Sequence, residues 1–155
     1  MPHIYLFDWG NTLMFDCPNQ NGKMKDWAVI TPIHGAREAL QSLSQNHKVY
    51  VATNAVDSSE SDIQSAFERA GLAPYITGYF CKENLGIGKG TVEFFEKILT
   101  KLNTEHQHIT MVGDSYSKDI QPALEAKINA IWFNPNNNPI YPSIKQIRCL
   151  TELCQ

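Results

Sequence analysis

The run His3-Ile4-Tyr5-Leu6-Phe7-Asp8-Trp9-Gly10-Asn11-Thr12-Leu13 decides the fold of this chain. Its segment 4–7 is short, rich in β-forming residues and not alternating, which predicts a strand buried on both faces, as in a parallel sheet. A strand buried in this way does not tolerate an uncompensated charge. Asp8 is therefore expected at the carboxyl end of the strand, where open α/β sheets place their ligands.

Strand and helix segments alternate along the rest of the chain. Further strands are predicted over 48–54, 79–81, 108–112 and 130–133. A helix is predicted after Pro32, through Ala36 and Leu43, with Asn46 or His47 at its end. Further helices are predicted from a cap at Ser58 or Ser59 to Gly71, through Phe94 and Leu102, and from a cap at Ser117 through Ala126. The segment 16–25 is expected as a loop or a small hairpin, 134–139 as a turn or loop, and 144–153 as a short terminal element. This alternation predicts an α/β fold with a three-layer, doubly wound, mostly parallel sheet.

Composition limits the classes of protein that fit. A chain of 155 residues suits one domain, 1–155, with a real core. The net charge of -3, without runs of like charge, makes nucleic acid and anionic membranes unexpected partners. There is no basic leader and no long apolar run, so we expect a cytoplasmic protein. The four cysteines lack metal spacing and fit reduced thiols.

Four polar side chains are expected at one rim of the sheet. Asp8, Thr53 and Asp114 each follow a predicted strand, and Lys89 precedes a predicted helix near the same edge. Each alone has an ordinary interpretation as a turn, a cap or a surface charge. Together, two carboxylates that would otherwise repel imply a hard cation such as Mg²⁺. A hydroxyl, turn amides and an ammonium suit a phosphoryl group.

These residues resemble the motifs of the haloacid dehalogenase superfamily, which is dominated by Mg²⁺-dependent phosphatases with a Rossmann-like fold, and the likeness spans essentially the whole chain. The segment 8–13 resembles the first motif, usually DxDGT, and 51–54 resembles the second. The segment 83–89 is similar to the third motif, with Gly90 where a proline often follows. The segment 112–115 with Asp119 resembles the acidic fourth motif, GDxxxxD.

The resemblance implies a covalent mechanism with a bound metal. Asp8 would be the nucleophile that forms an aspartyl-phosphate, which water then hydrolyses. Mg²⁺ would be held by the Asp8 carboxylate, the Gly10 carbonyl and Asp114. Asp119 would be a further ligand, a holder of water or the partner of Lys89.

The resemblance also implies how a phosphorylated substrate, either a small molecule or a macromolecule-linked phosphate, would be held. Thr53 and Lys89 would bind the phosphoryl oxygens, and Asn54 would assist. Trp9 and Trp27 are the aromatic candidates for substrate contact. The alternative for Trp27 is packing of its own loop.

Gly10 departs from the family pattern. Family phosphatases usually carry an Asp there, which protonates the leaving group and then activates water. Loss of this group, typically worth about 10²–10⁴-fold in rate, predicts a slow enzyme, a substrate with a good leaving group, or an acid from elsewhere. Asp16 is the candidate substitute.

The spacing of the motifs leaves no room for the cap domain that many members carry. We therefore expect an open site. In some capless members a neighbouring subunit covers the site, so a homodimer is a possible assembly. Other readings are a non-catalytic phosphate-binding or scaffold protein, a phosphonatase and a dehalogenase. Asp114 and Asp119 weigh against the dehalogenase, because halide displacement needs no metal. The missing cap, which normally supplies a lysine, weighs against the phosphonatase.

Overall fold

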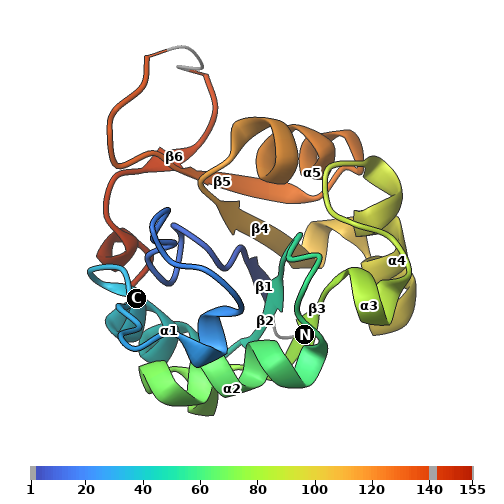
Figure 1. The fold of residues 1–155 in the computed structure, drawn as a ribbon. Helices are drawn as coiled ribbons and strands as arrows, with labels where there is room; N and C mark the ends of the chain where they lie inside the picture. The colour runs from blue at the N-terminus through green and yellow to red at the C-terminus, as the bar shows by residue number, and fades with distance from the viewer. Residues whose placement is uncertain (1–2, 140–142, 155) are drawn as a thin grey trace.

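One fully parallel sheet organises the molecule. The structure is a computed structural model that describes residues 3–139 and 143–154. Its sheet has six strands in the order β3-β2-β1-β4-β5-β6 (Figure 1). The strands are β1 Ile4–Phe7, β2 Lys48–Ala52, β3 Gly78–Phe80, β4 Ile109–Gly113, β5 Asn129–Phe133 and β6 Gln146–Ile147. The predicted parallel α/β fold is confirmed.

Helices cover both faces of this sheet and complete three layers (Figure 1). The α-helices are α1 Ala36–Ser44, α2 Glu60–Ala70, α3 Lys82–Leu85, α4 Val92–Leu102 and α5 Gln121–Glu125. Phe7 packs in one core with residues of α1 and α2, and its neighbour Leu6 packs in the other core with residues of α4 and α5. Both side chains are fully buried, as expected of a strand covered on both faces.

The strand order explains why the carboxyl end of β1 is the place for a site. Phe7 pairs with Val51 of β2 on one side and with Val112 of β4 on the other. The chain builds outward from β1 to β3 and then returns to add β4 and β5 on the opposite side. Open α/β sheets bind ligands at such a reversal of strand order, beyond the carboxyl ends of the strands.

The caps of the helices were predicted with mixed success. Ser59 caps α2 as expected, since its hydroxyl accepts the Asp62 N–H at 3.1 Å and the Asp62 carboxylate accepts the Ser59 N–H at 3.0 Å. The cap at Ser117 was wrong. Ser115 Oγ accepts the Lys118 N–H at 3.3 Å, and one π-helical turn, η4 Tyr116–Ile120, precedes α5.

Other differences concern short elements. Helix α1 ends at Ser44, before the predicted Asn46, and α3 and the 3₁₀ turns η2 Ala73–Tyr75 and η3 His106–His108 were not predicted. The segment predicted as a loop over 16–25 has no helix or strand before the 3₁₀ turn η1 Met24–Asp26. The predicted terminal element consists of two parts, β6 and the 3₁₀ turn η5 Leu150–Leu153. In the part of the chain that the structure describes, no helix has both the length and the apolar character needed to cross a bilayer.

Candidate active site

Asp8 is the residue around which the site is built. Its N–H donates to the Val112 carbonyl at 2.9 Å, so β4 still holds the backbone where the side chain leaves the sheet. The side chain is 12% exposed, and each carboxylate oxygen has its own partner. Lys89 Nζ lies 2.5 Å from Oδ1, and Thr12 Oγ1 lies 3.1 Å from Oδ2. The structure therefore puts Asp8 at the sheet edge, next to Lys89.

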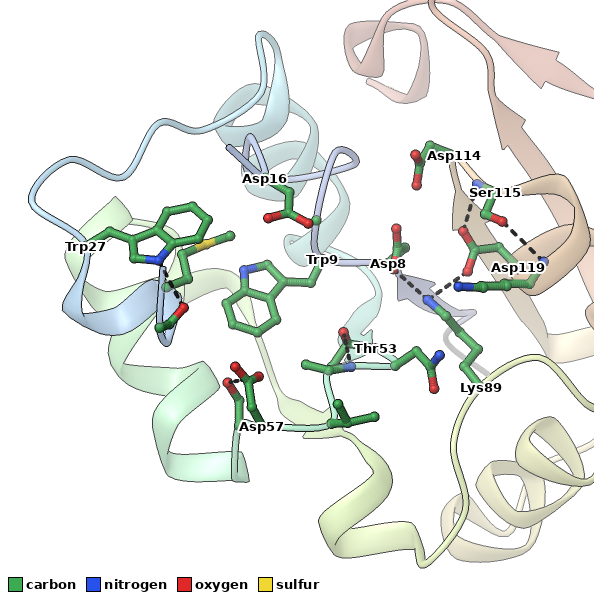
Figure 2. A pocket seen from close by; sticks show the side chains of 18 residues that line it. Asp8, Trp9, Asp16, Trp27, Thr53, Asp57, Lys89, Asp114, Ser115 and Asp119 are labelled. Carbon is green, nitrogen blue, oxygen red and sulfur yellow. Dashed lines mark hydrogen bonds and ion pairs between the residues drawn. The ribbon is translucent and has the colours of Figure 1, made fainter. Parts of the chain in front are cut away.

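Lys89 is a buried cation shared by two carboxylates (Figure 2). Its Nζ also donates to the Ala52 carbonyl at 3.0 Å and lies 2.7 Å from Asp119 Oδ1. Burial is the largest single effect and tends to raise the pKa of Asp8, but the Lys89 ammonium and the hydrogen bonds to the Asp8 carboxylate together hold the pKa below its usual value. Asp8 is therefore ionised at neutral pH, which is the state that a carboxylate nucleophile needs.

Thr12 links the two carboxylates that follow β1 and β4. Its fully buried hydroxyl oxygen lies 3.1 Å from Asp8 Oδ2 and 3.2 Å from Asp114 Oδ1, and it accepts the Asp114 N–H at 3.1 Å. A hydroxyl has one hydrogen, so Thr12 donates to one carboxylate at a time. Thr12 was not predicted to have a role, although its place four residues after Asp8 in the first motif was a usable signal.

Three carboxylates converge at this edge and form a candidate metal site. Asp8, Asp114 and Asp119 each offer an oxygen, and these oxygens all lie within 4.8 Å of one another. If all three were ionised, Lys89 would balance only one of the three charges. Burial and the neighbouring Asp8 raise the pKa of Asp114 to about 7, and the same two causes raise that of Asp119 to about 6. An oxygen-rich, negatively charged site of this kind fits a hard divalent cation.

Asp119 is held tightly below the end of β4. Its Oδ2 accepts the Ser115 N–H at 3.0 Å, and its own N–H donates to the Ser115 carbonyl at 2.8 Å. A Cβ at Gly113 would lie 2.2 Å from Asp119 Oδ2, so only glycine leaves room for this carboxylate. The turn η4 thus serves to bring Asp119 under the sheet edge and against Lys89.

Thr53 and Asn54 continue the chain beyond β2 and line the same cavity. The Thr53 N–H donates to the Phe80 carbonyl at 3.0 Å, and Thr53 Oγ1 accepts the Ala55 N–H at 3.2 Å. Among the residues that the structure describes, none accepts the Thr53 hydroxyl hydrogen, which can therefore be donated to a bound anion.

The cavity over these residues has a volume of about 540 Å³ and extends to Trp9, Met24 and Trp27 (Figure 2). Trp9 and Trp27 are only 5% and 7% exposed. Trp27 Nε1 donates to the Gly22 carbonyl at 3.1 Å and so packs its own loop, as the alternative interpretation held. Trp27 nevertheless forms part of the cavity wall, beside Trp9.

One feature of the site was missed from the sequence, and the structure explains a departure from the family pattern that was noted there. Lys118 is a second lysine on the cavity wall, and its position inside the fourth motif could have indicated it. Gly90, where the family pattern often has proline, has a φ of +119°. Proline is restricted to a φ near −65°, so this loop could not carry the family residue without a change of path.

Comparison with known proteins places these features in a family context. The family model described as haloacid dehalogenase-like hydrolase matches residues 12–133, a range that includes Thr53, Lys89, Asp114 and Asp119 but begins after Asp8. The pyrimidine 5'-nucleotidase PynA of Streptococcus pneumoniae is 32% identical over 107 residues, which cover 68% of this chain and 44% of that protein. The HAD-hydrolase YfnB of Bacillus subtilis is 29% identical over 125 residues, which cover 78% of this chain and 52% of that protein.

Solved structures agree on the fold. A crystal structure of YfnB bound to magnesium has a TM-score of 0.78 and 19% identity, covering 98% of this chain and 96% of that chain. The crystal structure of a protein from Listeria monocytogenes serotype 4b has a TM-score of 0.84 and 20% identity, covering 97% of this chain and 94% of that chain. By sequence, this chain spans about half the length of the curated relatives it matches, 52% of YfnB and 44% of PynA.

Proposed function

Since the chain belongs to the haloacid dehalogenase-like hydrolase family, we propose that it is a Mg²⁺-dependent phosphatase that hydrolyses a phosphate monoester. The observation that carries this proposal is the group of buried Asp8 and Lys89 with half-buried Asp114 at the switch point of the sheet. An ionised carboxylate beside a buried ammonium suits attack on phosphorus. The name of the relative PynA, a pyrimidine 5'-nucleotidase, supports a phosphatase more than a dehalogenase.

The proposed reaction assigns a task to each residue of the site. Asp8 attacks phosphorus and forms an aspartyl-phosphate, which water then hydrolyses. Lys89 and the Thr53 hydroxyl bind phosphoryl oxygens, with Asn54 beside them. Thr12 holds the carboxylate of Asp8 toward the cavity.

Asp8, Asp114 and the Gly10 carbonyl would hold Mg²⁺, which would neutralise charge on the phosphoryl oxygens. Asp119 keeps Lys89 charged and in place, because Asp119 Oδ1 lies only 2.7 Å from Lys89 Nζ.

The cavity also suggests a class of leaving group. The wall formed by Trp9, Met24 and Trp27 is apolar and aromatic, and it lies beside the phosphoryl site. Aromatic side chains favour flat ring systems through stacking. We propose a substrate that carries a ring close to its phosphate, such as a nucleotide.

Between β1 and β2 the described chain holds η1 and α1, and between β2 and β3 it holds α2 and η2, which supports a single domain over 1–155 without a cap.

The first prediction concerns metal removal. We expect the protein to hydrolyse aryl phosphates and nucleoside monophosphates with Mg²⁺, and to lose this turnover in EDTA, because Asp8 and Asp114 would then lack a neutralising cation. Phosphate release should be measured over a panel of phosphate esters, before and after Mg²⁺ is added back. If no ester in the panel is turned over with Mg²⁺, the phosphatase proposal fails.

The second prediction concerns the pH dependence of Mg²⁺ binding. Asp114 and Asp119, with pKa values of about 7 and about 6, hold protons up to near-neutral pH in the metal-free protein. Between pH 4 and 7 the folded protein thus binds more protons than the unfolded chain, so the contribution of these groups to the free energy of unfolding falls as pH rises. Mg²⁺ must displace the same protons, so its affinity should increase across this window.

We expect up to about tenfold tighter binding per pH unit for each proton displaced, and a plateau only once the pH is well above the Asp114 pKa of about 7. Calorimetric titrations at pH 5.5, 6.5 and 7.5 would measure this dependence. The matched variant Asp114→Asn should bind Mg²⁺ far more weakly at every pH. Equal affinity of the wild type at the three pH values would show that Asp114 does not bind the ion.

A further inference from the structure

The space that a side chain at position 10 would occupy is filled by Asp16. A Cβ built on Gly10 would lie 3.3 Å from both Asp16 Cβ and Asp16 Oδ2. Gly10 does not have a positive φ, so its backbone conformation does not itself require glycine. The Asp16 side chain is what crowds this position. A carboxylate is therefore present beside residue 10, although residue 10 supplies none.

The turn after β1 brings Asp16 back to this point. Trp9 O accepts the Leu13 and Met14 N–H groups at 3.0 and 3.2 Å, so the chain reverses tightly beyond the nucleophile. Asn11 adopts a φ of +62° within this turn, and its Oδ1 accepts the Asp16 N–H at 3.0 Å. These contacts position the Asp16 backbone through groups other than its carboxylate.

The Asp16 carboxylate differs from the other carboxylates of the cavity because it is unengaged. It lines the same cavity as Asp8 and Lys89, as Figure 2 shows, and no described residue forms a hydrogen bond or an ion pair with it. In contrast, Asp119 is paired with Lys89 and held by Ser115. Among the described residues, no structural contact therefore holds the Asp16 carboxylate away from a substrate in the cavity.

We propose that Asp16 is the general acid and base of this enzyme, an inference that rests on the proposed phosphatase function. Asp8 attacks phosphorus, the bond from phosphorus to the leaving oxygen breaks, and that oxygen takes the proton of the Asp16 carboxyl group. Water then attacks the aspartyl-phosphate and gives its proton to the Asp16 carboxylate. The bond from phosphorus to Asp8 breaks, inorganic phosphate is released, and Asp8 and Asp16 return to their starting states as a carboxylate and a carboxylic acid.

The test compares Asp16→Asn with Asp57→Asn, a control at a second aspartate of the cavity wall. Turnover should be measured over phosphate esters with graded leaving groups, from aryl to alkyl. The wild type should depend weakly on the leaving group. Asp16→Asn should lose about 10²–10⁴-fold on alkyl phosphates and far less on aryl phosphates, because poor leaving groups need protonation most. Acid quenching should also show accumulated aspartyl-phosphate in Asp16→Asn with an aryl phosphate, and little in Asp57→Asn.

A relocation of the carboxylate provides the second arm. Asp16→Ala removes the carboxylate beside Gly10 and leaves only its Cβ, 3.3 Å from the Cβ of a side chain at position 10. The double variant Gly10→Asp with Asp16→Ala should therefore regain alkyl phosphate turnover relative to Asp16→Ala alone. Circular dichroism would confirm that each variant is folded. Two outcomes would overturn the role of Asp16 and leave the phosphatase function standing. In the first, the wild type turns over and Asp16→Asn is as active as Asp57→Asn; in the second, the double variant gains no activity. A wild type without any turnover would overturn the phosphatase function and this role with it.

Discussion

Asp8→Asn is expected to abolish turnover, by about 10⁴-fold or more, while leaving the fold intact. An amide oxygen is a poor nucleophile, so no aspartyl-phosphate can form. The shape of the side chain is nearly unchanged, and Thr12 can still hydrogen-bond to it. Lys89 would retain Asp119 at 2.7 Å and the Ala52 carbonyl at 3.0 Å, so no buried charge is left without a partner.

The measurement is phosphate release from an aryl phosphate, together with the melting temperature and acid-quenched phosphoenzyme. Asp57→Asn is again the matched control, because it changes the same chemical group on the same cavity wall without touching Lys89. A folded Asp8→Asn protein that turns over at more than about one tenth of the wild-type rate would rule out the covalent mechanism.

Lys89→Met is expected to cause the largest loss of stability. The substitution leaves the buried Asp8 and Asp119 carboxylates without their shared cation. Removal of one partner from a buried ion pair costs about 3–5 kcal/mol in the free energy of unfolding, because the remaining charge stays desolvated. Methionine has a similar length, so the loss would come from charge more than from packing.

Urea unfolding of Lys89→Met and Lys118→Met would separate the two lysines of the cavity. Lys118 is exposed and should contribute less than about 0.5 kcal/mol, as is usual for surface positions. Equal unfolding midpoints for Lys89→Met and the wild type would show that the ion pairs of Lys89 do not stabilise the fold.

Most of the fold could be predicted because local signals agreed with one another. The unbroken apolar run before Asp8 indicated a strand buried on both faces, and the polar residues after later strands indicated one common edge. The capping residue Ser59 was also readable, since a serine followed three residues later by Asp62 is a local pattern.

The parts that could not be predicted depend on contacts between distant residues. Ser115, and not Ser117, caps the turn η4, because Asp119 must fold under Gly113 to reach Lys89, which lies elsewhere in the sequence. The placement of Asp16 beside Gly10 depends likewise on how the turn after β1 closes. Periodicity carries no information on such closures.

The two outermost strands of the sheet have a consequence for self-association. Edge strand β3 has three residues and edge strand β6 has two, whereas the strands between them have four or five. A short edge offers few unpaired backbone groups to a strand from another molecule, which discourages edge-to-edge aggregation. Two copies of this chain would therefore associate through helices or loops, and not by extending the sheet from one molecule into the next.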